Sequence, residues 1–135
     1  MENCCIENRC IKCCLNTSMP LLNLDVKRIQ SLGFNRKFFT KISNGWVQLK
    51  NKNGKCVFNN GIICVIYKNR LEGCRLYPII YDKDKNCATL DSYCPYKENF
   101  KISKNKTKLL FTLVLKLEYE KAQRKSEKDR YNSAN

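Results

Sequence analysis

The sequence predicts a small α+β domain with a short β-hairpin region, irregular loops and a long C-terminal helix. Three observations lead to this prediction. Short apolar runs in the middle of the chain are separated by Asn-Gly pairs, which favour tight hairpin turns. Residues 97–135 instead carry leucines at helical spacing. Much of the stretch before them is rich in cysteine, lysine and asparagine, so loops should occupy a large part of it.

Length and composition set the scale of the fold. The chain has 135 residues, of which 43% are hydrophobic and 28% charged, a composition typical of one globular domain. Its long lysine- and asparagine-rich stretches contribute little to a core, so a further kind of interaction should help to hold the domain together. We divide the chain into a cysteine-bearing part, residues 1–96, and a cysteine-free basic helical tail, residues 97–135, which packs on that part or extends from it.

A first helix is expected after Pro20, which ends an irregular segment. Asn23 is a suitable N-cap, and Asp25 would place a negative charge in the first turn. The apolar positions that follow at helical spacing are Val26, Ile29 and Leu32. Gly33 suits the position just after a helix, because glycine tolerates the left-handed conformation common there. A further short helical turn is expected over residues 36–42.

The middle of the chain predicts two reversals. Residues 46–58 are expected to form a hairpin around residues 51–54, which end in Asn-Gly, a strong turn signal. A second turn, Asn-Asn-Gly at residues 59–61, leads into another apolar run. Cys56 precedes this second turn and Cys64 follows it. The reversal is therefore expected to bring these two thiols close together.

The tail predicts one long helix, from about Ser103 or Thr107 to about Arg130. Its first half carries an apolar face made of Leu109, Leu110, Leu113, Val114, Leu117 and Ala122. Beyond Glu118 charges of both signs follow one another closely, which is typical of a solvated helix with fraying ends. A nucleic-acid-binding helix is the alternative, and the interspersed acidic residues count against it.

Ten cysteines are the main chemical feature of the chain. Met1 is followed by Glu2, Asn3 and a cysteine pair, without the apolar segment of a secretory signal. The longest apolar run, residues 109–117, is far too short to span a bilayer, so a cytoplasmic protein with no membrane partner is expected. Cytosolic thiols usually stay reduced, which favours metal ligation over disulfides. The alternative is a disulfide scaffold, as inside hyperthermophiles. The abundance of Lys, Ile and Asn fits an AT-rich genome, which a thermophile can have.

The first cysteines have the spacing of a metal-binding turn. Cys10-Ile11-Lys12-Cys13-Cys14 is a CxxCC motif, in which two thiolates can bind one metal while backbone amides point at the sulfurs. The adjacent Cys14 cannot easily join the same tetrahedron, so it should reach another iron or a second metal. All-cysteine sites suit zinc and iron alike, an iron–sulfur cluster included. The chain has no histidine, so any other ligand must be an oxygen, for which Asp25 is the candidate; a favourable helix N-terminal charge is its alternative role.

The middle of the chain carries four segments that resemble a family motif. They are Cys56-Val57-Phe58, Cys64-Val65-Ile66-Tyr67, Arg70-Leu71 and Cys74-Arg75-Leu76-Tyr77-Pro78. With Cys10, Cys13 and Cys14, they make the chain similar to the YkgJ-type cysteine-cluster family of zinc- or iron-chelating domains, which has a CxxCxxCC signature and is related to the flagellin lysine N-methylases. Cys94-Pro95 is similar to archaeal members, and Asp25 stands where members usually carry an Asp. The resemblance covers roughly residues 5–96.

The resemblance implies a metal-binding set made of Cys5, Cys10, Cys13, Cys14, Cys56, Cys64, Cys74 and Cys94. Such a set suits two four-coordinate sites or one polynuclear cluster, and the domain should then be metal-stabilised. The chain departs from the family pattern at Glu7, where a cysteine is expected, so Cys5 or Cys4 must take that role. Leu71 replaces an expected proline. Cys4 and Cys87 are otherwise expected to be thiols without a ligand role.

Two arginines and the net charge bear on what surrounds the metal. Arg70 and Arg75 could donate hydrogen bonds to metal-bound sulfur, or pair on the surface with Glu72 or an aspartate. The formal net charge of +14 at pH 7 is spread along the chain, so RNA, DNA or an acidic protein surface is an expected partner. A well-solvated basic surface without such a partner is the alternative.

Three functions therefore compete. The first is a metal-binding module with a structural or redox role beside an unknown protein partner in a larger system. The second is an RNA- or ribosome-associated basic protein whose metal only holds the fold. The third, implied by the resemblance alone, is an enzyme related to protein-lysine methylation. The chain lacks a Ser/His/Asp arrangement, since it has no histidine, and no glycine-rich phosphate loop is visible among its five glycines.

Overall fold

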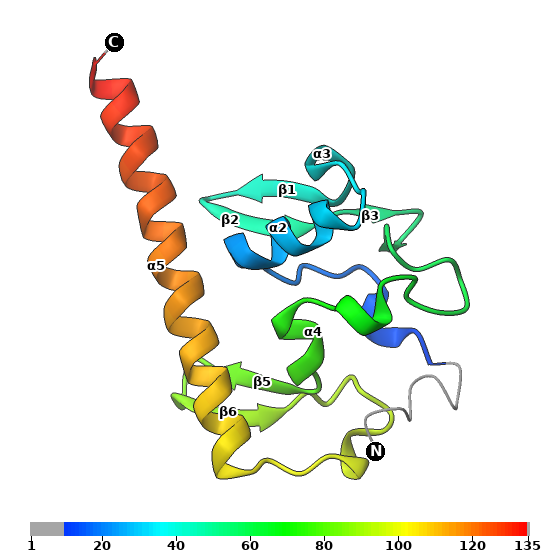
Figure 1. The fold of residues 1–135 in the computed structure, drawn as a ribbon. Coiled ribbons are helices and arrows are strands. Elements are labelled where there is room, and N and C mark those ends of the chain that lie inside the picture. Colours follow the sequence, from blue (N-terminus) through cyan, green and yellow to red (C-terminus); the bar gives the residue numbers. More distant parts are fainter. Residues whose placement is uncertain (1–9, 135) are drawn as a thin grey trace.

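The computed structural model describes the backbone of residues 10–134 and the side chains of residues 10–128. It confirms a small α+β fold with two-stranded antiparallel sheets and a long C-terminal helix (Figure 1). The α-helices are α2 (Asn23–Ser31), α3 (Arg36–Phe39), α4 (Glu72–Leu76) and α5 (Lys104–Ala134). The 3₁₀ helices are η1 (Lys12–Cys14), η2 (Tyr67–Asn69) and η3 (Lys97–Asn99). The sheets pair β1 (Thr40–Ser43) with β2 (Trp46–Leu49), β3 (Asn51–Lys52) with β4 (Lys55–Cys56), and β5 (Ile79–Asp82) with β6 (Cys87–Leu90).

Helix α2 begins at Asn23 and has Leu22 as its N-cap, which corrects the cap expected from the sequence. The Asp25 carboxylate accepts a hydrogen bond from the Leu22 N–H at 2.9 Å, so an acid in the first turn closes this helix end. Asn23 has another use, because its Oδ1 accepts a hydrogen bond from Arg124 on α5 at 2.7 Å. Gly33 follows the helix with a φ of +104°, as its position predicted.

The segment after α2 contains less helix than expected. Helix α3 ends at Phe39 and the chain continues as β1, so the helical turn expected as far as Ile42 is wrong beyond Phe39. β1 pairs with β2 around Asn44-Gly45, whose φ values of +52° and +85° suit a tight two-residue turn. Strand β2 was expected to pair across the next Asn-Gly turn, where only the short strands β3 and β4 pair. Two successive Asn-Gly turns therefore build this region.

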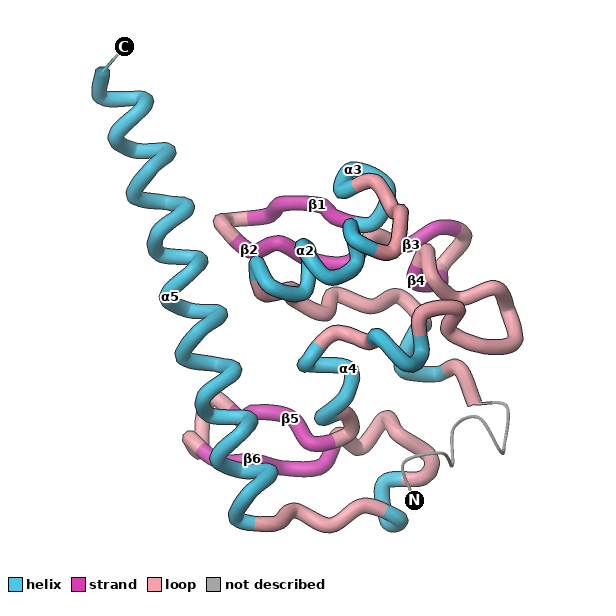
Figure 2. Tube along the Cα trace, in the orientation of Figure 1, coloured by secondary structure: helices cyan, strands magenta, loops and turns pink. Residues whose placement is uncertain are grey.

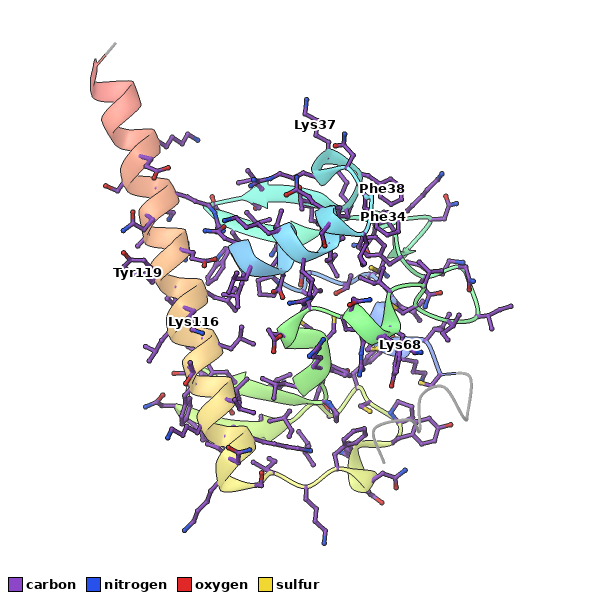
Figure 3. The ribbon with its side chains drawn as sticks, in the orientation of Figure 1. Phe34, Lys37, Phe38, Lys68, Lys116 and Tyr119 are labelled. Atoms are coloured by element: carbon purple, nitrogen blue, oxygen red, sulfur yellow. The ribbon has the colours of Figure 1, made fainter. Side chains whose placement is uncertain are left out.

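The main hydrophobic core lies between α2, β2 and the loops that follow β4. Its buried members are Leu21, Val26, Ile29, Phe39, Val47, Leu49, Cys56, Phe58, Ile66 and Leu71. Phe38, on α3, and Phe34, which precedes that helix, lie near each other (Figure 3), and the Phe34 ring meets the Phe58 ring edge-on with 5.0 Å between centroids. Loops make up most of the side where residues 57–71 pass (Figure 2). A cysteine thus belongs to the core itself, and the core borders the least regular part of the fold.

Helix α5 lies along one side of the molecule, from the β5–β6 sheet to beyond the β1–β2 sheet (Figure 1). It follows Ser103, whose Oγ accepts a hydrogen bond from the Lys106 N–H at 3.1 Å. A second buried cluster joins the helix to the body through Leu22, Leu113 and Leu117, with Trp46 and Leu76 packed against it. Leu109 is 52% exposed, so it does not belong to the apolar face predicted for it. The β5–β6 hairpin, which the sequence analysis did not anticipate, packs on the same helix through Tyr81 and Phe111.

The second half of α5 is docked more firmly than its charge pattern predicted. The Lys121 ammonium lies over the Trp46 ring, 4.3 Å from its centroid. Glu120 accepts a hydrogen bond from the Asn23 N–H at 2.8 Å, and Arg124 donates one to the Gly45 carbonyl at 2.9 Å. The expectation of a simply solvated helix beyond Glu118 is therefore wrong as far as Arg124. None of the helices in the described part of the chain combines the length and apolar character needed to cross a membrane.

The contact between α5 and the β1–β2 turn can be measured by adding one methyl group. A Cβ on Gly45 would lie 3.1 Å from Lys125 Cγ and 3.2 Å from the Lys121 carbonyl oxygen, in addition to the strain of a non-glycine residue at φ +85°. We expect Gly45→Ala to lower the free energy of unfolding by more than about 2 kcal/mol. Chemical denaturation measures this directly.

Gly54→Ala is the matched control. Gly54 occupies the same place in the other Asn-Gly turn, with a φ of +79°, but its Cβ would meet only Asn16 Oδ1 at 3.6 Å. We expect this control to cost about 1–2 kcal/mol, the conformational term alone. Equal losses for the two variants would show that α5 does not press on the β1–β2 turn.

Candidate metal centre

The N-terminal head, residues 10–19, is held against the β3–β4 hairpin. Within the head, η1 is closed by a hydrogen bond from the Cys14 N–H to the Ile11 carbonyl at 2.9 Å. The Asn51 side chain makes two hydrogen bonds with the backbone of Thr17, at 3.0 and 2.8 Å. The Asn16 N–H donates to the Gly54 carbonyl at 2.8 Å. This docking places the cysteines of the head beside the chain that leaves β4.

The Asn-Asn-Gly turn reverses the chain as the sequence predicted. Asn59 Oδ1 accepts a hydrogen bond from the Gly61 N–H at 2.7 Å, and Asn60 Oδ1 accepts one from the Ile62 N–H at 2.9 Å. Beyond the turn, the Val65 N–H donates to the Phe58 carbonyl at 2.8 Å. The reversal brings together Cys56 and Cys64, since a charge on Cys64 contributes to raising the pKa of Cys56.

Helix α4 carries Cys74 and is tied to α2 by buried polar contacts. Asp25 Oδ1 accepts a hydrogen bond from the Glu72 N–H at 3.3 Å, at the start of α4. Arg28 donates to the same carboxylate at 2.9 Å and to the Arg70 carbonyl at 2.7 Å. Burial raises the pKa of Asp25, while the hydrogen bonds from Leu22 and Glu72 and the charge of Arg28 oppose that effect. Asp25 is thus engaged in holding two helices together and does not line the cysteine cavity described next.

The head, the reversal and α4 converge on one cavity of about 60 Å³. The thiols that line it belong to Cys10, Cys13, Cys14, Cys56, Cys64 and Cys74. Apolar side chains, among them Phe58, Ile66 and Leu71, form much of the remaining wall. Residues from three separate stretches of the chain therefore present sulfur to one largely apolar cavity. This arrangement brings the head cysteines beside Cys56, Cys64 and Cys74.

Four of the thiols that line the cavity have shifted pKa values. Burial raises the pKa of Cys56 to about 12 and also raises those of Cys64 and Cys74. Cys14 differs, because a hydrogen bond from the Cys13 thiol, helped by Asn59 and the charge of Arg70, outweighs burial and lowers its pKa to about 7. A cation in the cavity would favour the thiolate form of all of them, since metal binding releases thiol protons.

Donors to sulfur surround the cavity. The Phe58 N–H is directed at the Cys56 sulfur and the Ile66 N–H at the Cys64 sulfur, each two residues after its cysteine. The Asn59 amide lies close enough to Cys14 to lower its pKa, yet its buried Nδ2 has no hydrogen-bond partner among the described residues. A metal-bound thiolate is a stronger acceptor than a neutral thiol and would satisfy such a donor.

Arg70 approaches the cavity from a fixed position. Its guanidinium stacks on the Tyr67 ring at 3.8 Å from the centroid, and its Nε donates to the Tyr67 carbonyl at 2.9 Å. Its charge lowers the pKa of Cys14 and opposes the effect of burial on Cys64 and Cys74. Arg75 differs from Arg70, because it does not line the cavity and its guanidinium reaches the Lys68 carbonyl at 3.4 Å.

These residues fit a thiophilic metal by donor chemistry. Across residues 10–128, no three Cys, Asp or Glu side chains are already placed so as to hold a metal ion. The eight described cysteines form no disulfide with one another. Converging thiols, N–H groups aimed at sulfur and an unsatisfied buried amide suit zinc or iron held by sulfur.

The remaining cysteines have separate positions. Cys94 is buried and lies outside the cavity, but its charge and that of Cys13 both contribute, after burial and Asp91, to raising the pKa of Tyr77. Cys94 therefore lies on the Cys13 side of the site. Cys87 is on β6, does not line the cavity and keeps no assigned ligand role. Cys4 and Cys5 lie outside the described residues, so the expected role of Cys5 stays a prediction.

Two residues near the site were missed by the sequence analysis. Asn59 was interpreted only as a turn residue, although its side chain both closes the turn and faces Cys14. Arg28 was not singled out, although it ties α2 to the segment before Cys74. A buried asparagine and a helix arginine carry no local signal, because their roles depend on contacts with distant parts of the chain.

Comparison with known proteins gives one result that bears on this site. Residues 4–95 match the family CxxCxxCC, described as a "putative zinc- or iron-chelating domain". No curated protein and no solved structure matches the chain. The matched stretch contains the head, the reversal and α4, and it ends before α5.

The unsatisfied amide of Asn59 yields a test of the site. Asn59→Asp keeps the oxygen that accepts from Gly61 but removes the donor and adds a negative charge beside the thiols. We expect zinc or iron affinity, measured by competition with a chelator, to fall about 10–100-fold. Asn60→Asp is the control, because it adds the same charge one residue away and keeps the acceptor for Ile62. Equal metal affinities for the two variants would show that the Asn59 side chain does not contribute to the metal site.

Proposed function

The chain belongs to the CxxCxxCC family, and on this basis we propose that it is a metal-binding protein that holds zinc or iron in its cysteine cavity. The observation that carries the proposal is the convergence of six cysteines from three separate stretches on one apolar cavity. A buried cysteine packs much as a small aliphatic side chain does, so packing alone gives no reason to place six thiols together. Their value as ligands explains the arrangement, because thiolates bind both metals strongly.

We propose further that the ligands form two sets. Cys14, Cys56, Cys64 and Cys74 influence one another electrostatically, and the pKa of Cys74 is raised by burial and by the other three. This first set has the number of sulfurs that a tetrahedral zinc or iron site needs. Cys10, Cys13 and Cys94 would supply the second set, with Cys5 as the expected fourth ligand. The division agrees with the CxxCC motif, in which Cys14 should reach a different metal from Cys10 and Cys13.

The role that fits best is structural. The loops around residues 57–71 contain little regular structure, and the core residues Phe58 and Ile66 come from these loops. When bound, the metal supplies thiolate bonds that cross-link the head, the reversal and α4, and such bonds contribute folding free energy. A redox role would follow if the metal is an iron–sulfur cluster. A reducing cytoplasmic setting is part of the proposal, since it keeps the thiols available.

Serine substitutions test the two sets. We expect Cys74→Ser and Cys13→Ser each to lose about half of the metal if two separate ions are bound, because each variant disrupts one set. Each would lose all of it if one cluster is shared. Cys87→Ser is the control and should keep the full amount, because Cys87 lies outside the cavity. Elemental analysis of anaerobically purified protein measures these contents, and full retention by both Cys13→Ser and Cys74→Ser would contradict the ligand assignment.

Metal removal and truncation separate the core from the tail. Chelation should abolish the cooperative thermal transition of the cysteine-bearing part, because the loops lose their cross-links. A chain ending at Ala122 should keep its metal but lose roughly 1–2 kcal/mol of stability, because the Arg124 hydrogen bonds to Gly45 and Asn23 disappear. Calorimetry with metal analysis of both samples checks this. Loss of metal from the truncated chain, or normal thermal unfolding of the chelated chain, would contradict the division into a metal-stabilised part and a separate tail.

A further inference from the structure

A polar groove lies on the α5 side of the molecule, separate from the cysteine cavity. It runs between α2, the β1–β2 turn and the second half of α5, and encloses about 1380 Å³ of open space. The residues that line it include Lys27, Gln30, Arg36, Asn44, Tyr119, Gln123, Lys125 and Lys128. The groove shares no residue with the cysteine cavity. Its function would therefore be independent of the metal-binding proposal.

The groove has a fixed base. Arg124 joins its walls, because its guanidinium donates to the Gly45 carbonyl at 2.9 Å and to Asn23 Oδ1 at 2.7 Å. Glu120 accepts from the Asn23 N–H at 2.8 Å and lies 3.5 Å from Arg124. These contacts hold α5 at a set distance from α2, so the groove is a built feature of the fold.

The charge lining the groove is unbalanced. Lys27, Arg36, Lys125 and Lys128 take part in none of the ion pairs formed within residues 10–128. Glu120 is already paired with Arg124. Glu127 is then the remaining acidic residue in the lining, and it can balance the charge of one of these four cations. Burial, together with the nearby charge of Arg36, lowers the pKa of Arg124. A polyanion in the groove would relieve this crowding of positive charge.

An aromatic ring and amides accompany the cations. Tyr119, midway along α5, projects from the side of the helix away from α2 (Figure 3) and so lies at the outer edge of the groove; it is 66% exposed, and its hydroxyl accepts a hydrogen bond from Gln123 at 2.9 Å. Gln30 and Asn44 add groups that can both donate and accept hydrogen bonds. Cations for phosphates, an exposed ring for stacking and amides for base edges are the components of single-strand recognition.

We propose that this groove binds single-stranded nucleic acid, with phosphates on Lys27, Arg36, Lys125 and Lys128 and an unpaired base on Tyr119. An acidic helical peptide fits less well, because such peptides are anchored by apolar side chains in apolar pockets. The apolar residues lining this groove are Val26, which is buried, and Ile42, which is exposed. Paired strands fit less well too, since the stacking face of a base in a duplex is covered by its neighbours.

The test uses the 135-residue protein as purified and a short fluorescent oligouridine, with binding followed by fluorescence anisotropy over a range of salt concentrations. The double variant Lys27→Gln/Lys125→Gln should bind roughly tenfold more weakly and reduce the slope of log affinity against log salt by about 1.4. Lys83→Gln/Lys85→Gln, on the exposed β5–β6 turn, removes the same charge elsewhere and should bind normally.

Tyr119→Ala should weaken binding roughly fivefold or more at constant salt slope, and Tyr119→Phe should not, because the ring is retained. Oligothymidine in place of oligouridine distinguishes DNA from RNA, and either one supports the proposal. Circular dichroism of each variant confirms that it is folded. Equal weakening by the groove pair and the turn pair, absence of binding to both oligonucleotides, or binding only of an acidic peptide would overturn the proposal.

Discussion

Burying four thiols next to the main core is the constraint on which the rest of the structure depends. Cys56 is a core residue, and Cys14, Cys64 and Cys74 pack directly against that core. In so apolar a place, thiols are held neutral by desolvation, which is why three of the four have raised pKa values. A cation bound here would reverse this preference, because metal binding favours the thiolate form of neighbouring cysteines. The local architecture follows from the need to bring these sulfurs together.

The scaffold meets this need with short-range hydrogen bonds because the region has little regular structure. The Asn59 and Asn60 side chains close the reversal, and the Asn51 side chain holds the head through Thr17. Asparagine suits these tasks because its amide can replace a backbone partner over two or three residues. The abundance of asparagine, which in the sequence suggests only loops, is therefore part of how the cysteines are positioned.

The reversal between Cys56 and Cys64 and the start of α5 could be predicted because their signals are local, whereas the helix continues to Ala134, past the end expected at about Arg130. Asn-Asn-Gly specifies a turn by its own side chains, and Ser103 with spaced leucines specifies a helix start and face. The sequence could not show whether β2 pairs across the Asn-Gly turn before it or the one after it, because both turns have the same local preference. The pairing depends on the packing of Val47 and Leu49 in the core. The β5–β6 hairpin was missed for a related reason, because its short strands gain their stability by packing on α5.

Residues in the first turns of helix α2 contact both the cysteine cavity region and helix α5. Asp25 and Arg28 bind the start of α4 and the Arg70 carbonyl, which places Cys74 and Arg70 at the cysteine cavity. Asn23, two residues earlier, binds Glu120 and Arg124 and so sets the width of the groove against α5. Loss of the buried Asp25 carboxylate would therefore disturb both the cavity and the groove. Substitutions farther along α5 can instead change the groove without affecting the cysteines. The cavity and the groove are separate in chemistry and share one helix as their mechanical support.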